Sequence, residues 1–266
     1  MTSALDQLVR KHPEMNVAAG TLQILATALT DPTLPAGIPH LEAAQIRLDS
    51  GVPALEGEAL LSGSELATQL EILTATLGTI NPTRCGLHPT DLEELAAAAR
   101  TGTWDWIAAV AERIGFEPDL MVTLLDHAAR PALRAGARAV GPVIAASRWS
   151  RGTCPACGSI PLIGELRGNS SDGSEQERVL RCGRCLTEWR FARLRCVSCG
   201  ESNHGRLAYL HGSGEGAYRR ADVCLTCRTY LKTIAVLAPL TLLELLAADL
   251  TTAALDVAAV ERGFHR

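Results

Sequence analysis

Eight of the nine cysteines in this 266-residue chain fall into four Cys-x-x-Cys pairs within residues 154–227. The pairs read CPAC, CGRC, CVSC and CLTC, and the first two recur as the last two at a constant spacing of 42 residues. The segment is therefore an internal repeat with two cysteine pairs in each copy. We expect each copy to form one metal site, and the predicted ligands are Cys154, Cys157, Cys182 and Cys185 in the first copy and Cys196, Cys199, Cys224 and Cys227 in the second.

The spacing suits a tetrahedral shell of four thiolates, which is typical of structural zinc and of rubredoxin-like iron. In both copies the second pair begins 25 positions after the first pair ends, which suits a short antiparallel ribbon that brings the pairs together. Gly158 and Gly200 follow the first pair of each copy, where glycine lets backbone amides turn toward sulfur. Two alternatives stay open: four disulfides, as in small secreted domains, and an interleaved pairing of the four turns.

The rest of the chain offers little for catalysis. Four thiolates leave no open coordination position, so the metal sites should be structural or redox-active and not hydrolytic. The ninth cysteine, Cys85, has no motif nearby that supplies an activating base, and we interpret it as an ordinary buried or loop thiol. Arg219, Arg220 and Asp222 could bind a partner, but a solvated charged face is the default interpretation. We therefore predict a protein that is not an enzyme, with no catalytic residues and no cofactor-binding residues other than the metal ligands.

The elements around the cysteines define the expected fold class, α+β. Leucine- and alanine-rich segments at helical spacing, separated by short loops, predict an all-α bundle before the cysteines. Its last helix should start near Asp119, break or kink at Pro131 and end near Pro142. Two rubredoxin-like or zinc-ribbon subdomains should follow, and a C-terminal helix should pack back on the bundle. The predicted domains are residues 1–147, 148–190, 191–232 and 233–266.

Charge and hydropathy narrow the choice of partners and compartment. The chain has a formal net charge of -4, whereas residues 148–232 hold 14 Lys or Arg and 8 Asp or Glu. Two four-thiolate sites, each with a divalent ion, would contribute about -2 apiece, which leaves too small a basic patch for a nucleic-acid coat. The first residues lack the pattern of a secretory signal, and acidic residues interrupt the most apolar run, 233–260. We expect a cytoplasmic protein with reduced cysteines and with neither nucleic acid nor membrane as a partner.

Several stretches of the cysteine region and its C-terminal flank match a known family pattern. They are CPACGSIPLIGEL, LRCGRCLTEWRFARLRCVSCG, YRRADVCLTCRTYLK and AADLTTAALDVAAVERGFHR. They include TEW at 187–189, RADVC at 220–224, YLK at 230–232, and Asp249, Leu255 and Asp256. On these motifs, roughly the last 120 residues resemble the FdhE family of formate dehydrogenase accessory proteins. The first half resembles the family only through its helices and LEAAQ at 41–45.

The resemblance implies an accessory factor that binds the catalytic subunit of a molybdenum- or tungsten-dependent formate dehydrogenase and supports its maturation. It also implies two rubredoxin-like subdomains beside a helical domain, with iron at the cysteine sites. Zinc fits the same four thiolates, so two ions of iron or zinc are the expected cofactors. Two other functions stay open, a zinc-ribbon nucleic-acid-binding protein and a rubredoxin-like electron carrier.

Overall fold

The computed structural model describes residues 4–28, 39–104, 106–168, 176–211 and 218–266. The chain divides into two compact units. The sheet unit comprises residues 1–20, 149–154 and 160–266, and the helical unit comprises residues 21–148 and 155–159. Helices and a sheet occur together, which confirms the α+β class. The domain boundaries predicted above divide the chain differently from these units and stay a prediction.

The long helix α7 (Pro118–Ala146) is the centre of the helical unit. It packs against α3 (Leu41–Asp49), α4 (Gly63–Leu77), α5 (Pro89–Thr101) and α6 (Ile107–Arg113). The predicted end near Pro142 is wrong, and the helix is not broken at Pro131 either, because α7 continues through both prolines to Ala146. Pro131 is buried, and packing against the neighbouring helices offsets the backbone hydrogen bond that a proline inside a helix loses.

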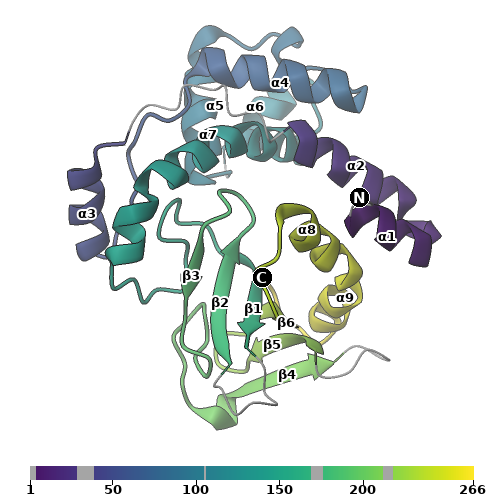
Figure 1. Ribbon diagram of the computed structural model, residues 1–266. Helices are drawn as coiled ribbons and strands as arrows, with labels where there is room; N and C mark the ends of the chain where they lie inside the picture. The colour runs from purple at the N-terminus through teal and green to yellow at the C-terminus, as the bar shows by residue number, and fades with distance from the viewer. Residues whose placement is uncertain (1–3, 29–38, 105, 169–175, 212–217) are drawn as a thin grey trace. The chain divides into compact units, whose positions relative to one another are not determined.

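The described residues of the sheet unit form a six-stranded sheet in the order β3-β2-β1-β6-β5-β4 (Figure 1). Each cysteine repeat supplies three antiparallel strands, the first β1 (Pro161–Arg167), β2 (Glu177–Cys182) and β3 (Glu188–Arg190), and the second β4 (Leu207–His211), β5 (Arg219–Cys224) and β6 (Tyr230–Val236). The first strand of one repeat and the last strand of the other, β1 and β6, pair in parallel from Gly164↔Thr233 to Arg167↔Val236. The two predicted subdomains are therefore joined by backbone hydrogen bonds into one sheet.

The C-terminal segment differs from the single helix expected from residue 233. Strand β6 continues to Val236, and α8 (Leu242–Thr251) and α9 (Ala253–Glu261) follow it. Within the sheet unit, α9 packs against β4, β5 and β6, and α8 packs against β1 and against α1 (Ala4–Lys11). Leu255, Ala259 and Phe264 bury apolar surface against the β5 and β6 side chains Ala221, Val223 and Tyr230. This helical segment therefore covers one face of the sheet.

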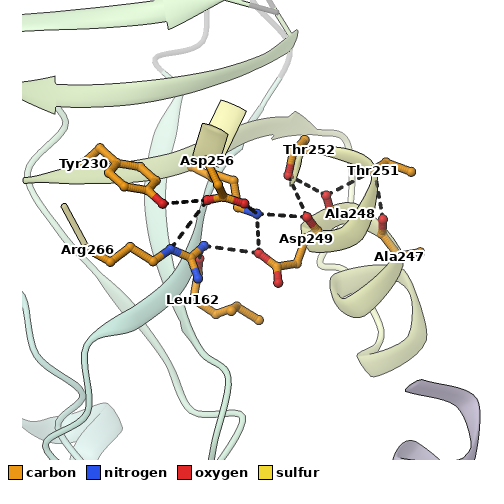
Figure 2. A network of polar contacts seen from close by, with 10 residues as sticks. Leu162, Tyr230, Ala247, Ala248, Asp249, Thr251, Thr252, Asp256 and Arg266 are labelled. Carbon is orange, nitrogen blue, oxygen red and sulfur yellow. Dashed lines mark hydrogen bonds and ion pairs between the residues drawn. The ribbon is translucent and has the colours of Figure 1, made fainter. Parts of the chain in front are cut away.

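A buried network of polar contacts joins α8 and α9 to β6. The Lys232 side chain is 1% exposed, and its Nζ lies 2.6 Å from a carboxylate oxygen of both Asp249 and Asp256. Tyr230 donates a hydrogen bond to Asp256 at 2.8 Å, and Arg266 Nη2 lies 3.2 Å from Asp249 (Figure 2). Burial and the hydrogen bond to Asp256 raise the pKa of Tyr230 to about 12, so this phenol stays a donor at neutral pH. The motif residues Tyr230, Lys232, Asp249 and Asp256 thus meet in one structural cluster.

The remaining described elements are short, apart from α2 (Asn16–Ala28). They are the 3-10 turns η1 (Pro13–Met15), η2 (Pro82–Arg84) and η3 (His204–Arg206). None of the helices in the described part of the chain combines the length and the hydropathy that a membrane span requires.

Candidate metal centres

Within the residues that the structure describes, the eight paired cysteines form two groups of four. In each group the four sulfur atoms lie within 4.8 Å of one another. The groups are the two sets that the sequential pairing predicts, Cys154, Cys157, Cys182 and Cys185, and Cys196, Cys199, Cys224 and Cys227. The structure thus brings all the predicted ligands together, and their coordination of an ion stays a prediction.

The separations between the sulfur atoms suit a shared ion. The Sγ atoms of Cys154 and Cys185 are 3.5 Å apart, and those of the pairs Cys196–Cys227 and Cys199–Cys224 are 3.7 Å apart. A regular tetrahedron around an ion with metal–sulfur bonds of about 2.3 Å has edges of about 3.8 Å. A disulfide requires about 2.05 Å, so these sulfurs are not bonded to one another. The donor set and its dimensions therefore fit a four-thiolate site for zinc or iron.

The two repeats build their cysteine turns in the same way. The amide of Cys182 donates to the carbonyl of Thr187 at 2.9 Å, and in the second repeat Cys224 donates to Thr229 at 2.9 Å. Gly158 and Gly200 have φ values of 77° and 76°, a conformation that glycine adopts without steric cost. These angles agree with the use of glycine after the first cysteine pair of each copy, and the donation of amides to sulfur in these turns stays a prediction.

Two threonines for which the sequence predicted no role at the metal sites contact the thiol groups. The hydroxyl of Thr187 lies 3.1 Å from the sulfur of Cys185, and that of Thr229 lies 3.0 Å from the sulfur of Cys227. Their signal in the sequence is the repeat itself, because they too are 42 residues apart. A hydroxyl that donates to a thiolate stabilises the charged form and orients it for an ion.

The two groups differ in their exposure to solvent. In the first group Cys154, Cys182 and Cys185 are buried and Cys157 is half-buried. In the second group Cys196 and Cys224 are buried, Cys227 is half-buried and Cys199 is exposed. Burial tends to raise the pKa of Cys227, but hydrogen bonds from Thr229, Cys199 and Cys196 outweigh it and lower that pKa to about 6. These hydrogen bonds favour the thiolate form of Cys227, which is the form that binds a metal ion.

The other singled-out residues lie outside the two groups. Cys85 is half-buried, and its sulfur lies 3.7 Å from the carbonyl of Asn81, an ordinary loop contact. Arg220 and Asp222 do not form the solvated face that we expected, because Arg220 Nε pairs with Asp222 at 2.7 Å and both are half-buried. Asp222 also accepts from Thr233 at 2.8 Å and lies 3.4 Å from the buried Arg178. Arg178 reaches Asp222 across strands β1 and β6, which its position in the sequence does not indicate.

Comparisons with known proteins agree with the motifs. Models of the FdhE central domain and the FdhE C-terminal domain match residues 153–193 and 194–266. A Protein FdhE homolog of Pseudomonas aeruginosa is 30% identical over 272 residues, which cover 98% of this chain and 84% of that protein. A Protein FdhE homolog of Pseudomonas putida is 31% identical over 238 residues, 87% of this chain and 73% of that protein. The crystal structure of the FdhE protein from Pseudomonas aeruginosa is similar with a TM-score of 0.63 and 26% identity, over 99% of this chain and 90% of that one.

Proposed function

This chain belongs to the FdhE family, and on that premise we propose that it is a cytoplasmic, non-catalytic accessory protein that binds the catalytic subunit of a formate dehydrogenase and supports its maturation. The observation that carries the proposal is the similarity to FdhE proteins over nearly the whole chain. The resemblance of the cysteine and C-terminal motifs to formate dehydrogenase accessory proteins supports the choice of client.

The eight cysteines hold two ions in this proposal, one in each group of four. An ion with four thiolate ligands has no open position, and it supplies either structural support or a one-electron redox centre. Thr187 and Thr229 hold their neighbouring thiolates, and the β1–β6 pairing keeps the two ribbons in one sheet. In this proposal the chain provides a rigid surface that binds another protein, and it has no catalytic site of its own.

Affinity capture from the source organism tests this role. A tagged chain at native expression level should capture the formate dehydrogenase catalytic subunit, identified by mass spectrometry, together with about two metal ions per chain. Cys199→Ser with Cys227→Ser should lose one ion and most of the captured subunit. Cys85→Ser, outside both groups, is the matched control and should behave like the wild type. Formate oxidation that is unchanged in a strain lacking the gene, with no subunit captured, would contradict the proposal.

One observation favours a second candidate, an electron carrier. Cys199 is exposed, so an ion in the second group would lie close to a possible redox partner. Iron in a four-thiolate site should give a reversible visible absorbance change on reduction, whereas zinc is redox-inactive. Colourless, zinc-loaded protein isolated from the native cells would remove this candidate.

A further inference from the structure

A cavity of about 320 Å³ lies in the sheet unit beside the second group of cysteines, with Cys196 and Cys224 in its wall. Four arginines line it, Arg178, Arg193, Arg195 and Arg220. We propose that this cavity binds an extended acidic segment of a protein partner. The inference rests on the proposed function in one respect, since the partner that carries the segment would be the formate dehydrogenase catalytic subunit.

The charge in the cavity is the first argument. Asp222 is the one carboxylate among its described lining residues, and it is already shared between Arg220 at 2.7 Å and Arg178 at 3.4 Å. The second group with a divalent ion would add about -2, which still leaves the cavity net positive. The guanidinium of Arg193 is exposed and has no ion-pair partner among the described residues. Planar guanidinium groups recognise carboxylates through paired hydrogen bonds.

The second argument is that the arginine-bearing segment is held in place. Arg178 is 5% exposed, and its Nη1 donates to the carbonyls of Arg193 at 3.4 Å and Arg195 at 3.1 Å. The guanidinium carbons of Arg178 and Arg195 lie 5.9 Å and 6.0 Å from the ring centre of Phe191. Because these contacts fix the backbone of residues 193–195 before a ligand arrives, binding orders little of the protein. Arg178 is thus a positioning residue for Arg193 and Arg195.

The third argument concerns the apolar part of the cavity, which favours a peptide over a small ion. Leu194 and Tyr209 are each 57% exposed and line the cavity, and Arg220 lies 5.1 Å from the ring centre of Tyr209. The β4 residues 207–209 also line it, and β4 is the terminal strand in the order of the described sheet. An extended segment can run beside such a strand and place acidic and apolar side chains alternately. Inorganic anions would leave this apolar surface uncovered.

Peptide binding by the full-length, metal-loaded protein tests the cavity without the client. The probe is a fluorescein-labelled octapeptide of alternating glutamate and leucine, and the reference peptide has glutamine in place of glutamate. We expect fluorescence anisotropy to show that the protein binds the glutamate peptide and not the glutamine peptide. The Arg193→Glu variant should bind the glutamate peptide about tenfold more weakly than the wild type does. Arg262→Glu, an exposed arginine of α9's C-terminal end that does not line the cavity, should leave the affinity unchanged. Metal content measured on each variant checks that the second cysteine group is intact.

Three outcomes would overturn the inference. The protein could bind both peptides equally well, or Arg193→Glu and Arg262→Glu could weaken peptide binding to the same extent. In the third, Arg193→Glu loses metal and its affinity for the peptide is unchanged. Pyrophosphate that binds with the same dependence on Arg193, while the peptide does not bind, would also overturn it in favour of a small-anion site. The catalytic subunit is then tested with the same variants, and weaker binding by Arg193→Glu alone supports both proposals. If the peptide binds as expected and the subunit does not bind at all, the proposed function fails and the acidic-segment site stands.

Discussion

At the residue scale, Gly152 lies where the structure leaves almost no room for a side chain. A Cβ atom there would lie 1.7 Å from the carbonyl oxygen of Val197, inside the first cysteine turn of the second repeat. The atoms of Val197 that the Cβ would meet belong to the backbone, so no change of side-chain rotamer relieves the overlap. A methyl group at residue 152 must therefore displace the turn that carries Cys196 and Cys199.

We predict that Gly152→Ala loses the ion of the second group and unfolds at lower temperature, at a cost of about 1–3 kcal/mol or more. Metal analysis and thermal unfolding measure the two effects. Gly141→Ala is the control, since a Cβ at that helical glycine meets nothing within 4 Å. A Gly152→Ala protein with two ions and an unchanged Tm would show that the turn can move freely.

A second residue-scale prediction concerns His127 in α7. Burial, helped by the charge of Arg130, lowers the pKa of its imidazole from 6.5 to about 4. The folded protein therefore binds this proton less well than the unfolded chain does, so His127 costs stability as the pH falls from about 6.5 to about 4. We expect His127→Gln, which cannot titrate, to reduce the loss of Tm across this window while leaving Tm near pH 7.5 almost unchanged. Parallel curves for the two proteins from pH 7.5 to 4.5 would contradict this.

At the element scale, the attachment of α8 and α9 to β6 depends on a buried cation. Lys232 contacts both Asp249 and Asp256, so its removal leaves two carboxylates short of a partner near the core. We predict that Lys232→Met lowers the free energy of unfolding by about 3 kcal/mol, because breaking a buried ion pair costs more than an exposed one. Urea unfolding measures the change. Lys11→Met, at an exposed position of α1, should stay within about 0.5 kcal/mol of the wild type.

The elements also show where sequence reasoning succeeds and where it stops. The four-cysteine sets were predictable because a constant spacing of 42 residues records a local structure used twice. The length of β6 was not predictable, because residues 233–236 pair in parallel with β1, a partner some seventy residues earlier in the chain, and residues 233 and 234 also pair with β5. The sequence also failed to predict that α7 continues through Pro131 and Pro142. Here too the cause is tertiary, because packing against other helices overrides the local tendency of proline to end a helix.

At the scale of the whole molecule, the duplicated cysteine groups are similar in geometry and different in environment. The spacing predicted their ligands but not this difference, nor the arginine cavity, because both depend on which strands become neighbours. Arg178 belongs to the first repeat and Asp222 to the second, and only the joined sheet brings them together. The sequence thus indicated the two cysteine groups, and the fold determines how far each group is exposed to solvent and to a partner.

The difference in solvent exposure between the two cysteine groups predicts which group loses its metal ion first. With a chromophoric chelator in excess, the second group should release its ion first, since Cys199 is exposed, whereas its counterpart in the first group, Cys157, is half-buried. Alkylation with iodoacetamide during the reaction should mark Cys199 and Cys227 before Cys154 and Cys182, as read by peptide mass spectrometry. Single-phase release with simultaneous labelling of all eight cysteines would show that the two groups open together.

The parallel pairing of β1 with β6 also has a consequence for synthesis on the ribosome. Strand β1 leaves the exit tunnel before its neighbour β6, which is the last strand of the second ribbon to be translated. Until then the nascent chain presents an unpaired strand edge, which is a template for aggregation. Metal bound early by the first ribbon would hold β1 against β2 while its other edge is open, so iron or zinc starvation should harm newly made chains more than mature ones.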